Sequence, residues 1–417
     1  MTQPPSPSDR PDRRNKFFDS EFHDGFGQWP VAYIPVGGAD MGDIVAVADE
    51  VAGGDDSVFH QAWVAAGDRK SAEAVSVLAA GHRASARSLF LRASCLYSSA
   101  NHPLYGGPVD PRLIAAYDKQ MNAFQRAMEL SAVPVQPISI PYEGTELPGW
   151  LIPAHGRESE VLPLIILNNG YDATITDLYF ASGVAALERG YHVLMFDGPG
   201  QGEMLYKRGV PLRPDWEVVI SAIVDYAMSV EIVDPKKIVL SGWSLGGYLA
   251  PRAASREHRL AACIADPGQW DIAEAFRSFA VQLGASADEV ADLNALSETT
   301  IERMWGAIQK NRQLRWSIVQ RGFWANGVTD LRAFIQASAQ FTLKDQVGDI
   351  RCPTLLTSAE LDPLGAATRA FHEALTCPKT LLEFTAAEGA GGHCEMANRS
   401  LLNQRVLDWL DDTLATS

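Results

Sequence analysis

Hydrophobic and polar residues change their spacing along this chain, and the changes divide it into segments. From Ser57 to Tyr97, apolar residues recur every three or four positions in a stretch rich in Ala, Leu, Arg and Glu. Such spacing predicts amphipathic helices. A further helix is predicted to begin at Pro111, with Asp110 as its N-cap, and to run toward Leu130. Residues 40–130 are therefore predicted to be helical.

The pattern changes at Pro134, where short apolar runs begin to alternate with helical stretches. Two short strands are predicted around the turn Glu143-Gly144-Thr145. Further strands are predicted within 163–170, 191–200, 236–244, 260–268, 352–358 and 379–384. Such alternation is typical of right-handed βαβ units around a mostly parallel sheet. Residues 271–346 interrupt the series without a strand pattern, and we interpret them as a helical insertion that can act as a lid.

These changes predict four units along the chain. Residues 1–15 are expected to be a disordered lead-in, because they are polar and rich in proline. Residues 16–133 are expected to form an N-terminal helical domain. An α/β core is expected from residues 134–270 and 347–417, with the helical insertion 271–346 between its two parts.

Composition and charge narrow the possible partners. The chain has 417 residues, of which 47% are hydrophobic, and a formal net charge of −16. That acidity argues against nucleic acid and against an anionic membrane surface as partners, and no apolar run reaches the length of a membrane span. The five cysteines are scattered without CxxC spacing, which indicates a reducing compartment. Since the N-terminus also lacks the apolar core of a secretory signal, we expect a cytoplasmic protein.

The pentapeptide GWSLG at 242–246 carries the clearest chemical signal. It fits the nucleophile-elbow pattern G-x-S-x-G, in which a strained strand-to-helix bend exposes a serine Oγ at the top of a sheet. The context agrees, because an apolar strand pattern precedes it and a helix-prone stretch follows it. The alternative is a packing turn of small residues. Ser244 is therefore predicted to be a nucleophile.

A nucleophile elbow needs a base and an orienting acid further along, in the order Ser, then Asp or Glu, then His. His393 lies in a glycine-rich loop after the last predicted strand and is predicted to be the base, whereas His372 lies in a helical stretch. Asp362 follows the preceding strand and is predicted to be the acid. Asp266 and Glu360 are alternatives, with simpler interpretations as a turn residue and a solvated loop charge.

The loop NNGYD at 168–172 follows a predicted central strand. Gly170 gives it the freedom to turn backbone N–H groups inward, so the amides of Tyr171 and Leu245 are predicted to form an oxyanion hole. Asp172 then stands at the mouth of the site. It is either a substrate contact or the N-cap of the following helix.

Aromatic residues supply candidates for an apolar pocket. Trp243, beside the nucleophile, is predicted to contact substrate. The other candidates are Trp216, Trp305, Trp316, Trp324 and Phe323. Most tryptophans within an insertion belong to its core, so only one or two of the six are expected to touch substrate. In the loop FDGPGQGE at 196–203, Asp197 is predicted to be structural and Glu203 to fix the loop.

Four motifs together resemble those of a known family. SGWSLGG, FDGPGQGE, ELDPL and EGAGGHCEMANR are similar to motifs of α/β-hydrolases of the 2,6-dihydroxypseudooxynicotine hydrolase type and of the related fungal heptaketide hydrolyases. The likeness covers residues 130–417, and a helical domain before the core matches the family's plan. In that family a glutamate often stands at the position of Asp172. An arginine or a small residue is expected at the position of Trp243.

The resemblance implies an α/β-hydrolase fold, no metal or organic cofactor, a small aromatic or polyketide substrate, and a homodimer. With the triad Ser244, Asp362 and His393, it implies hydrolysis of a carbon–carbon bond by a retro-Claisen route in an acylated aromatic, polyketide or 1,3-diketone. The residues alone leave other activities open, because the acyl half of the reaction is the same. These are an ester or lactone hydrolase, an acyltransferase or cyclase of a natural-product pathway, and an inactive fold used as a binding module.

Overall fold

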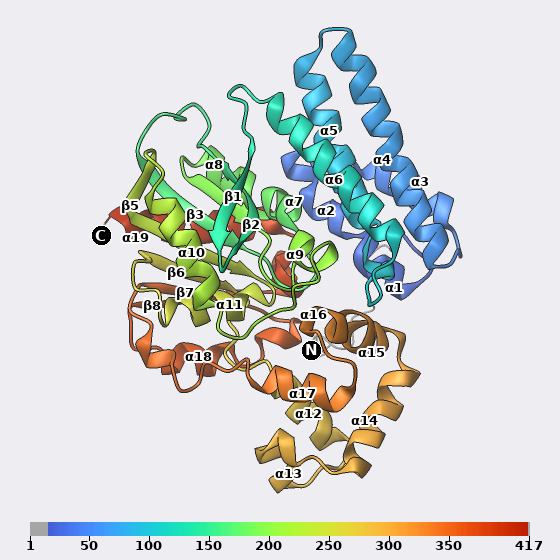
Figure 1. Ribbon diagram of the computed structural model, residues 1–417, viewed down its shortest axis with the longest axis vertical. Helices are drawn as coiled ribbons and strands as arrows, with labels where there is room; N and C mark the ends of the chain where they lie inside the picture. Colours follow the sequence, from blue (N-terminus) through green and yellow to red (C-terminus); the bar gives the residue numbers. More distant parts are fainter. Residues whose placement is uncertain (1–15, 416–417) are drawn as a thin grey trace, which may run out of the picture.

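The computed structural model describes residues 16–415, so the predicted lead-in 1–15 lies outside the described residues. Figure 1 shows a central sheet, the N-terminal helices at the upper right, and the helices of residues 271–346 at the bottom. No helix among the described residues is long and apolar enough to cross a membrane.

The sheet contains eight strands in the order β1-β2-β4-β3-β5-β6-β7-β8. β2 pairs antiparallel with both β1 and β4, and every other neighbouring pair is parallel. The strands are β1 (Pro137–Tyr142), β2 (Thr145–Ile152), β3 (Leu162–Asn168), β4 (His192–Phe196), β5 (Val233–Trp243), β6 (Ala262–Asp266), β7 (Thr354–Ala359) and β8 (Lys379–Phe384). The predicted mostly parallel sheet is confirmed, and each predicted strand is present.

Apolar residues cover both faces of the sheet, as parallel strands require. Ile166 and Leu240 point into one core, and their neighbours Ile165 and Val239 point into the other. The first core is closed by α10 (Glu217–Met228), α11 (Gly246–Ala254) and α18 (Thr368–Ala374). The second is closed by α7 (Ile175–Leu178), α8 (Val184–Glu188) and the C-terminal α19 (Arg399–Ala415). Because the parallel strands all end at one edge, the loops after β3, β5, β7 and β8 meet there.

The N-terminal region is helical, as predicted. Its α-helices are α1 (Glu21–Gly27), α2 (Trp29–Tyr33), α3 (Met41–Val51), α4 (Asp56–Ala79), α5 (Arg83–Ser99) and α6 (Pro111–Glu129). The predicted cap of α6 is present, because the Asp110 side chain accepts the Arg112 backbone N–H at 2.8 Å. The helical stretch predicted from the spacing begins at residue 40, so α1 and α2 were not predicted as individual helices.

The segment between β6 and β7 is also helical, as predicted. It contains α12 (Glu274–Gln282), α13 (Ala287–Ala291), α14 (Glu298–Lys310), α15 (Arg312–Arg315), α16 (Trp324–Asn326) and α17 (Leu331–Ala339). These helices share an apolar core that includes Phe276, Met304 and Phe334. The insertion also rests on the N-terminal helices, since Trp316 Nε1 donates to the His102 carbonyl at 2.7 Å. The boundaries of the four predicted units stay predictions.

Candidate active site

Ser244 lies at the bend between β5 and α11. Its backbone has a φ of 60°, a left-handed conformation that is costly for a residue with a side chain. The flanking glycines leave no room for a Cβ. One on Gly242 would lie 1.8 Å from the Gly246 carbonyl oxygen, and one on Gly246 would lie 2.6 Å from the Asn168 carbonyl oxygen. The sharp bend predicted from the sequence is therefore present.

Three side chains from different loops form a hydrogen-bonded chain at this edge of the sheet. Ser244 Oγ lies 2.9 Å from His393 Nε2, and His393 Nδ1 lies 2.7 Å from Asp362 Oδ2. The Asp362 side chain is 1% exposed and that of His393 is 40% exposed. The carboxylate is thus shielded from water while the imidazole reaches both the serine and the solvent. The structure brings together the three residues predicted as nucleophile, acid and base.

The loop after β3 lies directly against Ser244. A Cβ on Gly170 would lie 2.8 Å from both the Leu245 nitrogen and the Ser244 Cβ, so only glycine allows this approach. Within residues 16–415, the backbone N–H groups of Tyr171 and Leu245 donate to no other protein group. Both amides predicted for the oxyanion hole are therefore available to a ligand.

Asp172 lines the cavity beside Ser244 and is paired with the helical insertion. Its Oδ2 accepts from Arg321 Nη1 at 2.7 Å, and its buried Oδ1 has no partner among the described residues. The alternative interpretation of Asp172 as a helix N-cap is wrong. Thr174 caps α7 through a capping box with Asp177, which competes more effectively because it satisfies two backbone amides.

The alternative acids are engaged elsewhere. Asp266 is buried and lies under the His393 loop, where its carboxylate pairs with Arg399 Nη1 at 2.9 Å and accepts from Thr357 Oγ1 at 2.9 Å. Burial, followed by the neighbouring Asp266, raises the pKa of Glu395 well above its usual range. Glu360 accepts a backbone N–H in an exposed loop.

Arg399→Leu is expected to lower the free energy of unfolding by about 3–5 kcal/mol, because it leaves the Asp266 charge buried without its partner. The Arg399 side chain is 5% exposed and also donates to the Cys394 carbonyl at 2.8 Å. Urea denaturation followed by tryptophan fluorescence measures the loss. Arg405→Leu removes a solvent-accessible pair with Glu388 from the same helix and should change stability little. Equal midpoints for the two variants would contradict this account.

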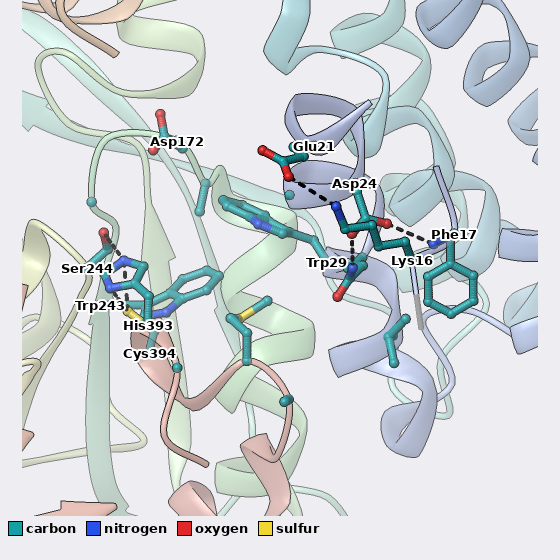
Figure 2. Close-up of a pocket in the computed structure, with 18 residues that line it drawn as sticks. Lys16, Phe17, Glu21, Asp24, Trp29, Asp172, Trp243, Ser244, His393 and Cys394 are labelled. Atoms are coloured by element: carbon teal, nitrogen blue, oxygen red, sulfur yellow. Dashed lines mark hydrogen bonds and ion pairs between the residues drawn. The ribbon is translucent and has the colours of Figure 1, made fainter. Parts of the chain in front are cut away.

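A cavity of about 590 Å³ opens beside Ser244 and His393 (Figure 2). One wall comes from the core and includes Gly170, Trp243 and Met396. The opposite wall comes from residues 16–31, which include α1 and the first part of α2. Asp24 and Trp29 belong to this wall. Both predicted substrate contacts, Asp172 and Trp243, line this cavity.

The aromatic candidates lie mostly away from the cavity, in keeping with the expectation that only one or two of them touch substrate. Of the six aromatic candidates, Trp243 is the one that lines the cavity in the described part of the chain. Trp316 is buried against the rings of Phe22 and Phe26, and Trp216 donates to Asn168 Oδ1 in the core. These indoles are held by core contacts that composition alone does not reveal.

Sequence reasoning also missed the wall formed by α1 and α2. A usable signal was present, because Phe18, Phe22, Phe26 and Trp29 recur at spacings of four, four and three. The Trp29 ring of this wall lies close to the Trp243 ring of the facing wall, with ring centroids 6.0 Å apart.

Asp197 is structural, as predicted. Its buried carboxylate accepts from Tyr117 Oη at 3.0 Å and from two backbone N–H groups, those of Ile175 and Glu203. Burial raises its pKa to about 7. Glu203 binds Arg208 and so fixes its own loop.

The chain is similar to known hydrolases in sequence and in fold. Residues 164–402 match the model of the alpha/beta hydrolase family. Hydrolase acrC of Aspergillus aculeatus is 30% identical, over 95% of this chain and 97% of its own. The 20-hydroxy-prefusarin hydrolase FUS2 of Gibberella moniliformis is 31% identical, over 96% and 98%. The crystal structure of the 2,6-dihydroxy-pseudo-oxynicotine hydrolase shares the fold, with a TM-score of 0.71, 22% identity, and coverage of 93% and 96%.

Proposed function

Because this chain belongs to the α/β-hydrolase family, we propose that it is a serine hydrolase with Ser244, His393 and Asp362 as its catalytic triad. The observation that carries the proposal is the unbroken hydrogen-bond chain from the Ser244 Oγ through His393 to the buried Asp362 carboxylate. His393 takes the serine proton as Oγ attacks a substrate carbonyl. Asp362 holds the imidazole in the required tautomer and stabilises the imidazolium.

The tetrahedral intermediate places a negative oxygen beside the bend. The free N–H groups of Tyr171 and Leu245 bind this oxyanion, and they are most effective because their positions are fixed before reaction. His393 then gives its proton to the leaving group, and water, activated by the same imidazole, hydrolyses the acyl-serine. The His393 side chain is 40% exposed, so water can reach the imidazole, which supports hydrolysis over transfer to another acceptor.

The proposed substrate is an acylated hydroxyaromatic, polyketide or 1,3-diketone, cleaved at a carbon–carbon bond. In such a retro-Claisen step the leaving group departs as an enolate or phenol tautomer, and His393 supplies the proton to carbon. Asp172 Oδ1, buried and without a protein partner among the described residues, is proposed to accept a hydrogen bond from a substrate hydroxyl. One relative is named for a hydroxylated small molecule, 20-hydroxy-prefusarin, which agrees with this choice.

The cavity is expected to prefer neutral substrates over anionic ones. Its lining carries three carboxylates, of which Glu21 pairs with Lys16 at 3.1 Å and Asp172 pairs with Arg321 at 2.7 Å. The carboxylate of Asp24 has no cationic partner among the described residues. Adding a carboxylate to the far end of a substrate should therefore lower kcat/KM by about tenfold, and added salt should reduce the difference. Steady-state kinetics of an acid and its methyl amide at two salt concentrations test this. A preference for the acid would contradict it.

The test of the reaction itself is a paired assay in oxygen-18 water, with Ser244→Ala as the control. One arm offers aryl esters, and the other offers aryl 1,3-diketones and acylated polyhydroxyaromatics. Label in an acid released from the diketone arm, absent with Ser244→Ala, supports carbon–carbon hydrolysis. Turnover of esters alone identifies a carboxylesterase and rejects the carbon–carbon reaction. A wild-type Ser244 that does not react with a fluorophosphonate rejects the serine hydrolase.

A further inference from the structure

Two glutamine side chains hold the carbonyl groups behind the proposed oxyanion hole. Gln201 Nε2 donates to the Asn169 carbonyl at 2.8 Å and to the Gly170 carbonyl at 3.0 Å. Gln269 Nε2 donates to the Ser244 carbonyl at 2.8 Å. Neither glutamine lines the cavity among the described residues, so neither is placed to touch substrate.

Two of these three carbonyls, those of Gly170 and Ser244, belong to the same peptide groups as the proposed oxyanion donors. The Gly170 carbonyl shares a peptide plane with the Tyr171 N–H, and the Ser244 carbonyl shares one with the Leu245 N–H. In a trans peptide the carbonyl and the N–H point in opposite directions across a rigid plane. The cis bonds in the described chain are Gly107–Pro108 and Asp266–Pro267, so both of these peptides are trans. Fixing each carbonyl therefore fixes the direction of the N–H on the other side.

We propose that Gln201 and Gln269 are positioning residues that preorganise the Tyr171 and Leu245 amides for the oxyanion. The inference rests on the proposed serine hydrolase function. It also gives a role to the loop FDGPGQGE, whose glutamine has no place in the catalytic triad.

Gln201 is held so that its amide cannot turn around. Its side chain is buried in a residue that is 1% exposed, and its Oε1 accepts the Gly198 backbone N–H at 3.0 Å. Rotation of the amide by 180° would place Oε1 against two carbonyl oxygens and its NH₂ against an N–H donor. The loop after β4 thus presents two N–H bonds to the loop after β3 in one fixed orientation.

The two glutamines are expected to differ in importance. Within residues 16–415, the Gly170 carbonyl accepts from no donor except Gln201. The Ser244 carbonyl also accepts the Gly247 backbone N–H at 2.8 Å, inside the first turn of α11. Loss of the Gln201 side chain therefore frees the Gly170–Tyr171 peptide. Loss of the Gln269 side chain leaves the Ser244–Leu245 peptide with one restraint, the Gly247 N–H.

The experiment compares Gln201→Met and Gln269→Met with Gln120→Met. Gln120 is a matched control, because it is fully buried and donates to the Thr174 and Thr176 hydroxyls, not to an oxyanion peptide. Two readouts are the rate at which a fluorophosphonate labels Ser244 and the ratio of kcat/KM for an aryl ester and its thiono analogue. Sulfur accepts hydrogen bonds weakly, so a competent oxyanion hole favours the oxygen ester.

Gln201→Met is expected to lower kcat and the labelling rate by about 10²-fold, with KM nearly unchanged, and to bring the oxygen-to-sulfur ratio toward one. Gln269→Met should lower both rates by about tenfold. Gln120→Met should shift the midpoint of thermal unfolding without changing the ratio. If Gln201→Met does not fold, Gln269→Met carries the test through the same two readouts, because the Gly247 N–H still holds the Ser244 carbonyl in that variant.

Failure of the serine hydrolase and failure of the positioning role give different results. A wild-type protein whose Ser244 is not labelled rejects the serine hydrolase, and the positioning role with it. A wild-type protein that is labelled, together with a Gln201→Met protein (or Gln269→Met in its place) of unchanged labelling rate and unchanged oxygen-to-sulfur ratio, overturns the positioning role alone. Equal losses in Gln201→Met and Gln120→Met would also overturn it, because they would show a general effect of cutting a buried amide.

Discussion

Ser244→Ala is expected to lower kcat/KM by about 10⁶-fold while leaving the fold unchanged. The variant removes the attacking Oγ but keeps the Cβ and the left-handed backbone at the bend, where φ is 60°. Among residues 16–415, the Ser244 hydroxyl makes one hydrogen bond, the 2.9 Å contact with the solvent-accessible His393, and the variant loses it. The thermal unfolding midpoint should therefore move little.

The measurement combines turnover on the best substrate with mass spectrometry of trapped acyl-enzyme. Cys394 provides a further check, because its Sγ lies 3.3 Å from His393 Nε2. Burial raises the pKa of this thiol, so it is a poor nucleophile. If Ser244→Ala retained activity that Cys394→Ala abolished, the assignment of the nucleophile would be wrong.

Asp362→Asn is expected to lower kcat/KM by about 10⁴-fold. The amide cannot stabilise an imidazolium, and its NH₂ favours the tautomer that places the His393 proton on Nε2, facing Ser244 Oγ. The Asp362 side chain is 1% exposed, so no water replaces the lost charge. Kinetics across pH measure the effect on catalysis separately from stability.

Glu360→Gln is the matched control for Asp362→Asn. Glu360 lies two residues away and its carboxylate accepts the Ala386 N–H at an exposed position. The change should leave kcat/KM within about twofold, because surface substitutions away from a site have small effects. A loss of less than tenfold in Asp362→Asn would contradict the assignment of Asp362 as the acid that supports His393.

The sheet and the Ser244–His393–Asp362 arrangement were predictable for a simple geometric reason. Short apolar runs mark the strands, and parallel strands deliver the loops that follow them to one edge. Residues as distant in sequence as Ser244 and His393 therefore meet once the strand order is known. The local pattern GWSLG predicted the position of the bend. Its glycines are required because a Cβ at either position would lie less than 3 Å from a backbone oxygen.

Other features depend on pairings between distant segments, which a periodic pattern does not contain. The Asp172–Arg321 pair joins the loop after β3 to the insertion, and Asp266 pairs with Arg399 from the last helix. The sequence contains the capping box of α7, Thr174 and Asp177. It also contains Asp172, a second residue able to cap a helix, two positions before Thr174. The sequence did not show which one or two of the six aromatic candidates line the cavity, because burial in a core and burial against a ligand select the same side chains.

The residues of α1 and α2 that face the cavity and the residues of the hydrogen-bonded triad come from different parts of the chain. The hydrogen-bonded triad lies wholly on the loops that follow β5, β7 and β8, whereas much of the facing surface is contributed before the first strand. A library at Glu21 and Gly25, the exposed positions of α1, is therefore expected to vary substrate preference while leaving the Ser244–His393–Asp362 hydrogen-bond chain unchanged. Asp24 has to be spared, because its carboxylate accepts the backbone N–H of Phe17 at 2.8 Å and anchors the wall. Directed evolution of this scaffold would begin at its amino end.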